Sequence, residues 1–130
     1  MGKPIEVKED VRYADLDTLG HVNNAVYLSY FEHARVKMFA EYYQKYGNFH
    51  FVIAHAEVDY IKPIYLETIT IRAWVSRIGK TSFTIDYEIY NENGELCAKG
   101  KTVQVGYDPE RKAKREIEGE FLRYIERYYV

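Results

Sequence analysis

The order of two hydrophobic patterns along the chain is what most constrains its fold. Residues 24–46 carry apolar side chains at spacings of three and four, as an amphipathic helix requires, namely Tyr27, Phe31, Ala34, Met38 and Tyr42. Gly47 and Asn48 follow and are expected to end this helix. Four runs of alternating apolar and polar residues follow the helix in sequence. This alternation is typical of a strand with one buried face. A chain with this order of patterns places one long helix against one sheet.

The alternating runs are long and the connections between them are short. They cover residues 52–60, 69–76, 83–89 and, less regularly, 96–107, and residues 5–13 form a further strand before the helix. Turns are expected at Gly79-Lys80 and at Asn93-Gly94, and the second is a strong hairpin signal. Strands joined by such turns are antiparallel. We therefore predict an α+β domain, in which an antiparallel sheet of about five strands wraps a long central helix and a second amphipathic helix covers residues 116–128.

Side-chain size and polarity predict what each face of this sheet contacts. Small residues are expected on the inner faces, where they let the helix lie close: Ala54, Ala56, Ala73, Ala98 and Gly100. The outer face carries Trp74 and Tyr90 among charged residues, and such an aromatic patch is typical of a contact with another subunit.

Length and composition narrow the class of protein. The 130 residues are expected to form a single domain, residues 1–130. The formal net charge of −2 gives no indication of nucleic-acid binding. Cys97 is the one cysteine and cannot form a disulfide within the chain, which favours a reducing, cytoplasmic location. No apolar run approaches the roughly 20 residues that span a membrane, and neither a signal peptide nor membrane binding is expected.

The segment of residues 12–27, RYADLDTLGHVNNAVY, carries the candidate chemistry. Two acids, Asp15 and Asp17, precede a glycine turn, and the polar pair Asn23-Asn24 then opens the predicted helix. A carboxylate near a helix start can act on water or on a carbonyl, and the free N–H groups of the first helical turn can hold the resulting oxyanion.

The same segment resembles the hotdog-fold acyl-CoA thioesterases of the 4-hydroxybenzoyl-CoA thioesterase family. The resemblance rests on Tyr13-x-Asp15-x-Asp17-x-x-Gly20-His21-Val22-Asn23-Asn24, followed by Tyr27 and by Phe31-Glu32-x-Ala34-Arg35. Two weaker matches follow, Asp59-Tyr60-x-x-Pro63 and Gly79-Lys80-Thr81-Ser82-Phe83. It covers roughly residues 5–108 and implies a hotdog fold, in agreement with the helix-and-meander pattern.

The resemblance also implies a mechanism and a set of site residues. Asp17 matches the family's catalytic acid, as a general base or as a nucleophile, and the backbone N–H of Asn24 matches the group that polarises the thioester carbonyl. The matching substrate-binding positions are Gly20, His21, Val22, Asn23, Tyr27, Asp59, Tyr60, Lys80 and Ser82. The family implies an acyl-CoA substrate, a site formed between two subunits, and a homo-oligomer that is a dimer or a dimer of dimers (a homotetramer). No cofactor is implied.

Several of these residues also have structural interpretations. Asp17 alone is as readily a turn or capping residue, and Asp15 is expected to be a hydrogen-bonding partner of the turn or a surface acid. His21 is expected to shape the pocket rather than to act as an acid or base. Glu32 is expected to pair with Arg35 or with another chain.

Four basic residues have two possible roles, and the chain has two alternative functions. Arg77, Lys80, Lys99 and Lys101 either meet the phosphates of coenzyme A or are solvated charges at strand ends. The four scattered histidines and one cysteine show no metal-ligand spacing. One rival function is a hotdog dehydratase or hydratase acting on 3-hydroxyacyl thioesters, and the other is an acyl-CoA-binding module without turnover.

Overall fold

A computed structural model describes residues 2–130, and its longest helix, α1, covers Tyr27–Tyr46. The helix begins after a short 3-10 turn, η2 (Asn24–Val26), whose N-cap Asn23 accepts a hydrogen bond from the Ala25 N–H with its side chain. It ends at Gly47, whose φ of 79° a side chain would resist and whose N–H donates to the Tyr43 carbonyl. The helix predicted for residues 24–46 is therefore confirmed, except that its first three residues form a 3-10 turn.

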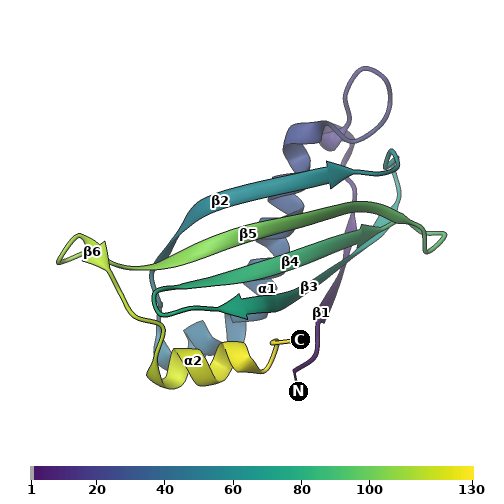
Figure 1. Ribbon diagram of the computed structural model, residues 1–130. Coiled ribbons are helices and arrows are strands. Elements are labelled where there is room, and N and C mark those ends of the chain that lie inside the picture. The colour runs from purple at the N-terminus through teal and green to yellow at the C-terminus, as the bar shows by residue number, and fades with distance from the viewer. Residues whose placement is uncertain (1) are drawn as a thin grey trace.

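One antiparallel sheet curls around this helix (Figure 1). Its strands lie in the order β1-β3-β4-β5-β2, with the short β6 paired to the end of β5. The bounds are β1 (Ile5–Asp10), β2 (Phe51–Tyr60), β3 (Thr68–Ile78), β4 (Ser82–Tyr90), β5 (Leu96–Asp108) and β6 (Ala113–Lys114). A 3-10 turn, η1 (Tyr13–Asp15), and the helix α2 (Gly119–Glu126) complete the chain. This confirms the predicted α+β architecture.

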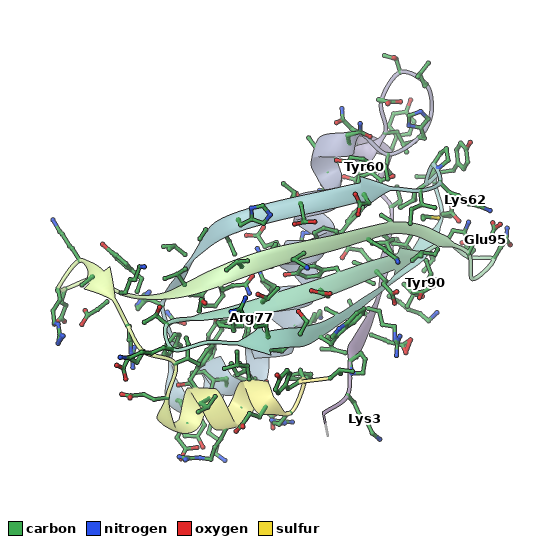
Figure 2. All side chains as sticks on the ribbon, in the orientation of Figure 1. Lys3, Tyr60, Lys62, Arg77, Tyr90 and Glu95 are labelled. Atoms are coloured by element: carbon green, nitrogen blue, oxygen red, sulfur yellow. The ribbon has the colours of Figure 1, made fainter. Side chains whose placement is uncertain are left out.

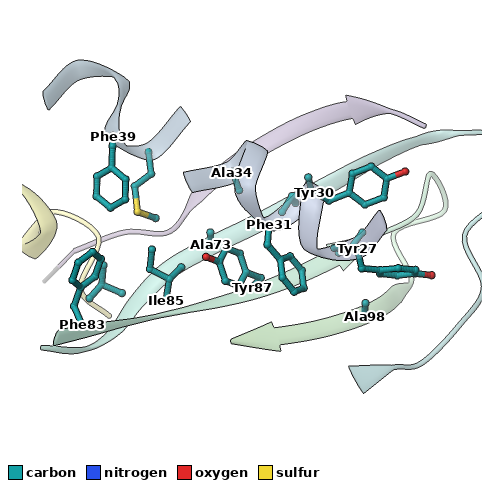
Figure 3. Close-up of a cluster of buried hydrophobic side chains, with 14 of the residues drawn as sticks. Tyr27, Tyr30, Phe31, Ala34, Phe39, Ala73, Phe83, Ile85, Tyr87 and Ala98 are labelled. Carbon is teal, nitrogen blue, oxygen red and sulfur yellow. The ribbon is translucent and has the colours of Figure 1, made fainter. Parts of the chain in front are cut away.

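The core lies between α1 and the concave face of the sheet. Figure 3 shows side chains of α1 and of the strands meeting in this layer. The ring of Phe31 stacks on that of Tyr87 with centroids 4.3 Å apart. Gly100 on β5 lies beneath the same ring, and an added Cβ would overlap it. Ala73 and Ala98 are fully buried, so three of the predicted small residues do let the helix lie close.

The remaining two, Ala54 and Ala56, are exposed, so they do not let the helix lie close as predicted. Ala56 does lie on the inner face, where it lines the groove between α1 and β2. The register of β2 against β5 shifts between Ile53 and His55. A bulge of this kind interrupts the alternation of a strand, so the side chains before and after it no longer share one face. In addition, β2 is an edge strand of the sheet, and most of its residues are exposed.

Two further predicted boundaries differ from the structure. The first strand ends at Asp10, because the chain turns away through η1 rather than continuing to residue 13. The second helix is shorter than residues 116–128, since Glu118 is its N-cap. Its buried face, which includes Phe121, covers one end of the core, and the Tyr124 hydroxyl donates to the Met38 carbonyl of α1 at 2.6 Å.

The two aromatic residues on the outer face of the sheet are partly covered by charged neighbours. Trp74 is half-buried, with the Arg72 guanidinium 5.9 Å from its ring centre. Tyr90 is half-buried too, and its hydroxyl donates to the Glu88 carboxylate.

Within residues 2–130, no helix has the length and apolar character needed to cross a bilayer.

Candidate active site

The hairpin that joins η1 to α1 carries the predicted acid. Its two arms are held together by backbone hydrogen bonds, from the Asn23 N–H to the Asp15 carbonyl and from the Asp17 N–H to the His21 carbonyl, both 2.9 Å. Gly20 closes the tip with a φ of 84°, which disfavours a side chain, and its N–H donates to the Asp17 carbonyl. A second anchor comes from the loop after β2, where the Ile64 carbonyl accepts from the Val22 N–H.

The Asp17 carboxylate is fixed but still reachable from solvent. Its Oδ1 accepts a hydrogen bond from the Leu19 N–H at 2.8 Å. Its Oδ2 lies 3.4 Å from Nδ1 of His21, and the Asp17 side chain is 27% exposed. Asp17 therefore has the turn interaction expected from its structural interpretation, and it also keeps an oxygen available to a water molecule or a carbonyl carbon.

Asn24 presents a backbone N–H that has no hydrogen-bond acceptor among residues 2–130. It stands at the start of η2, which runs on into α1, and helix starts carry partial positive charge from such unpaired N–H groups. A negatively charged oxygen placed here would be stabilised.

Beside Asn24 lies a cavity of about 180 Å³. It is lined by His21, Val22, Asn24, Tyr27, Tyr60, Ile61, Lys62 and Pro63. The Tyr60 hydroxyl donates to the Asn24 carbonyl at 3.0 Å, and its ring meets that of Tyr27 edge-on with centroids 4.9 Å apart. Burial raises the pKa of Tyr27 to about 12, so its hydroxyl stays protonated at neutral pH. Figure 2 shows Tyr60 and Lys62 at the end of β2 that approaches this loop.

Asp17 lines a neighbouring depression of about 620 Å³ rather than the cavity beside Asn24. Its walls are Tyr13, Leu16, Asp17, Thr18, Gly20 and Asn23. The structure thus brings eight of the predicted site residues to one end of the molecule: Asp17, Gly20, His21, Val22, Asn23, Asn24, Tyr27 and Tyr60.

The other three predicted site residues line neither the cavity beside Asn24 nor the depression beside Asp17. Asp59 is exposed and opposite Lys99, on the other face of the sheet from Tyr60. Lys80 and Ser82 flank the turn before β4, where the Lys80 side chain pairs with Glu116 at 3.5 Å.

The sheet register places this turn far from the Asp17 end of the molecule. Ser82 and Val52 are both opposite Val105, whereas Tyr60 is opposite Ala98. At about 3.4 Å per residue, the eight residues from Val52 to Tyr60 separate the two ends by about 27 Å.

Glu32 and Arg35 do not form the predicted ion pair. The Arg35 guanidinium instead donates to the Tyr87 hydroxyl at 3.1 Å. Glu32 is exposed and has no ion pair among the described residues. Both line a groove of about 250 Å³ between α1 and β2. Pairing of Glu32 with another chain stays a prediction.

Sequence reasoning gave Lys62 no place in the site. Lys62 lines the Asn24 cavity and pairs with Glu95 at 2.5 Å. Its neighbour Pro63 was part of the weak sequence match, so the match pointed to this loop without identifying the lysine. Across residues 2–130, no group of three or more His, Cys, Asp or Glu side chains is arranged to hold a metal ion.

Known proteins resemble this chain in sequence and in structure. A family model of the thioesterase-like superfamily matches residues 11–125. A thioesterase from Thermus thermophilus, solved in complex with coenzyme A and Zn, is 38% identical, with 92% of this chain and 90% of that chain covered at a TM-score of 0.79. A predicted thioesterase from Bacillus stearothermophilus is 28% identical, covers 98% and 97% of the two chains and has a TM-score of 0.89. The putative acyl-CoA thioesterase YneP of Bacillus subtilis is 28% identical over 107 residues, 78% of each chain.

Proposed function

This chain belongs to the thioesterase-like superfamily and is a thioester hydrolase, and we propose that it hydrolyses an acyl-coenzyme A to the free acid and coenzyme A. The hotdog fold implied by the sequence motif is confirmed by the wrapped helix and by the thioesterase structures it superposes on. The observation that carries the proposal is the unpaired Asn24 N–H at a helix start, one hairpin arm away from the solvent-reachable carboxylate of Asp17.

In this proposal Asp17 drives the attack on the thioester carbonyl carbon. As a general base it takes a proton from water, and the hydroxide forms the new C–O bond while the C–S bond breaks. As a nucleophile its own oxygen forms that bond, and water then hydrolyses the mixed anhydride. On both routes the sulfur leaves as the coenzyme A thiolate and takes up a proton. The Asn24 N–H holds the negative carbonyl oxygen formed on the way.

His21 shapes the site in this proposal. Its Nδ1 lies 3.4 Å from the Asp17 carboxylate and 3.5 Å from the Val22 carbonyl. A ring held between these two oxygens limits where the Asp17 side chain can turn. His21 also lines the cavity beside Asn24.

We further propose that two copies pair through their β2 edges and that each site is completed by its partner. Two β2 strands related by a two-fold axis run antiparallel, so the Val52 end of one lies beside the Tyr60 end of the other. The turn with Lys80 and Ser82 of the partner then approaches the Asp17 end of this chain. This arrangement is supported by the exposure of β2. It also accounts for the separation of about 27 Å, within one chain, between the turn with Lys80 and Ser82 and the Asp17 end.

The buried, unpaired thiol of Cys97 is in keeping with a reducing compartment, and we propose a cytoplasmic location.

Thiol release from a panel of short, long and aromatic acyl-CoAs tests the reaction. Wild type is compared with Asp17→Asn and with Asp86→Asn, which removes a carboxylate that accepts a hydrogen bond from Ser76 on the outer face of the sheet. We expect Asp17→Asn to lower kcat by on the order of 10²–10⁴ and Asp86→Asn to leave it unchanged. A folded Asp17→Asn protein with full activity would contradict the role of Asp17. A folded wild type that releases no thiol from any acyl-CoA would contradict coenzyme A as the carrier.

A further inference from the structure

The carboxylate of Asp15 is buried at the base of the Asp17 hairpin, and the proposed reaction does not use it. Asp15 is 2% exposed. Its Oδ1 accepts from Nε and Nη2 of Arg12 at 3.2 and 2.9 Å, and its Oδ2 accepts from the Arg12 N–H at 3.0 Å and the Tyr30 hydroxyl at 2.8 Å. Asp15 is therefore the hydrogen-bonding partner of the turn and not a surface acid.

These contacts keep the buried carboxylate ionised. Burial by itself raises the pKa of Asp15, but the hydrogen bonds from the Arg12 backbone, the Arg12 guanidinium and Tyr30 together hold it below its ordinary value. The Arg12 guanidinium also compensates the Asp15 charge at 2.9 Å. Asp17, two residues on, thus has no uncompensated carboxylate beside it.

Tyr30 connects the hairpin to the helix that presents the Asn24 N–H. It is a residue of α1 with 1% exposure, and it lies six residues after Asn24, about 9 Å along the helix axis. Its hydroxyl donates to Asp15, and this side-chain hydrogen bond joins the acid's segment to α1 in addition to the backbone bond from the Asn23 N–H to the Asp15 carbonyl.

The residues at the tip of the hairpin are not buried. Thr18, Leu19 and Gly20 are exposed, and Leu19 is 77% exposed. Packing at the tip therefore does not fix Asp17. Its position depends on the arms and the base of the hairpin, where Leu16 and Val22 pack on the core and Asp15 bonds to Tyr30.

We propose that Asp15 and Tyr30 are positioning residues that hold the Asp17 hairpin at a fixed place relative to the start of α1. This inference rests on the proposed function, because it concerns the distance between the acid and the Asn24 N–H. A reacting group displaced by about 1 Å can lose about 100-fold in rate. The Asp15–Tyr30 bond thus acts on turnover without either side chain touching the substrate.

The test compares two buried tyrosines that each donate to a single acceptor. Tyr30→Phe removes the bond to Asp15, and the matched control Tyr124→Phe removes the 2.6 Å bond to the carbonyl of Met38, eight residues further along α1 than Tyr30. Both are assayed for thiol release well below the unfolding temperature of either variant. We expect Tyr30→Phe to lower kcat about 10- to 100-fold with KM unchanged, and Tyr124→Phe to keep the wild-type kcat.

Asp15→Asn provides a second variant, because it keeps one acceptor oxygen and the size of the side chain. We expect its kcat to fall at least as far as that of Tyr30→Phe, again without a change in KM. Wild-type kcat in both variants, or an equal fall in Tyr124→Phe, would overturn the positioning role. Asp17→Asn is measured alongside, since full activity in that variant would instead remove the proposed function on which this inference rests.

Discussion

The two edges of the sheet are built in different ways. At one edge β1 is only six residues long, and Glu6, Lys8 and Asp10 give it exposed charges. At the other edge β2 is ten residues long and exposed over most of both faces, including the apolar side chains of Val52 and Ile53. Short charged edges resist pairing with other strands, whereas long apolar edges favour it.

The chain also covers the part of β3 that β1 does not reach. The Val75 N–H donates to the Tyr128 carbonyl at 2.8 Å, and the Val130 N–H donates to the Val75 carbonyl at 3.0 Å. The Gly2 N–H then donates to the Tyr129 carbonyl at 2.9 Å, so both ends of the chain close this edge together. Within residues 2–130, the β2 edge is therefore the one that the chain leaves open.

The largest expected effect comes from a charge on the open edge, in Ile53→Asp. Ile53 is 42% exposed, so the single chain keeps the new carboxylate solvated. In a dimer paired through β2, the new carboxylate of each subunit is buried, at a cost of about 3 kcal/mol for each. The two together raise the dimer Kd by roughly 10⁴-fold. We expect sedimentation to show a folded monomer. We expect the assay of thiol release to show little activity.

The matched control for Ile53→Asp is Glu6→Lys on the closed edge. We expect this variant to keep the wild-type mass and activity, because Glu6 is exposed and far along the sheet from β2. An Ile53→Asp protein that sediments as a dimer with full activity would show that pairing does not use the open edge.

The two edges also mark the limit of what the sequence predicts. Helix and strand types were predictable because they depend on local periodicity, and both ends of α1 were marked by Asn23 and Gly47. The alternation in residues 52–60 looks like that in 69–76, yet β3 is buried on its inner face and β2 is not. Strand order and the bulge at Ile53 decide this, and neither has a local signal.

The candidate site divides in the same way. Residues 15–24 cluster because they form one hairpin, so a contiguous motif was enough to find them. Periodicity identifies Tyr30 as a core position of the helix but does not reveal the bond of its hydroxyl to Asp15. Lys80 and Ser82 matched a family landmark, whose distance from Asp17 in a single chain follows only from the sheet register.

Removal of residues 128–130 opens the closed edge and has the next largest effect. The variant loses the bonds that join Val75 to Tyr128 and Val130 and the bond from Gly2 to Tyr129. These three bonds contribute about 1 kcal/mol each, and the variant also loses the turn bonds of Tyr128 and Tyr129 and the packing of the Tyr128 ring against the core. We expect the free energy of unfolding to fall by at least about 3 kcal/mol in urea titrations. Tyr129→Ala is the control, since it keeps the backbone bonds and its side chain is 43% exposed. Equal stability of the truncated and full chains would show that the tail does not close the edge.

Gly2→Ala tests how closely the two chain ends approach each other. An added Cβ would lie 2.6 Å from the Arg127 carbonyl oxygen and 2.6 Å from the Tyr129 nitrogen, both backbone atoms that cannot rotate away. The N-terminal residues can detach instead, which limits the loss to the hydrogen bonds from Gly2 and Lys3, about 1–2 kcal/mol. Thermal unfolding measures this loss against Lys3→Ala, which keeps the backbone bonds. An unchanged midpoint in Gly2→Ala would contradict the close approach.

The smallest effect is expected from the ion pair that accompanies the tail. Arg127 Nη1 lies 2.9 Å from Glu41 Oε2, but the two side chains are 51% and 64% exposed. Exposed pairs contribute about 0.5 kcal/mol, and salt at about 1 M screens them beyond about 3 Å. We expect Glu41→Gln to lower stability by about that amount at low salt and by almost nothing at high salt. Glu110→Gln, at an exposed position outside the helices and without an ion pair in the described chain, is the control. If Glu41→Gln were as damaging as loss of residues 128–130, the ion pair rather than backbone pairing would hold the closed edge.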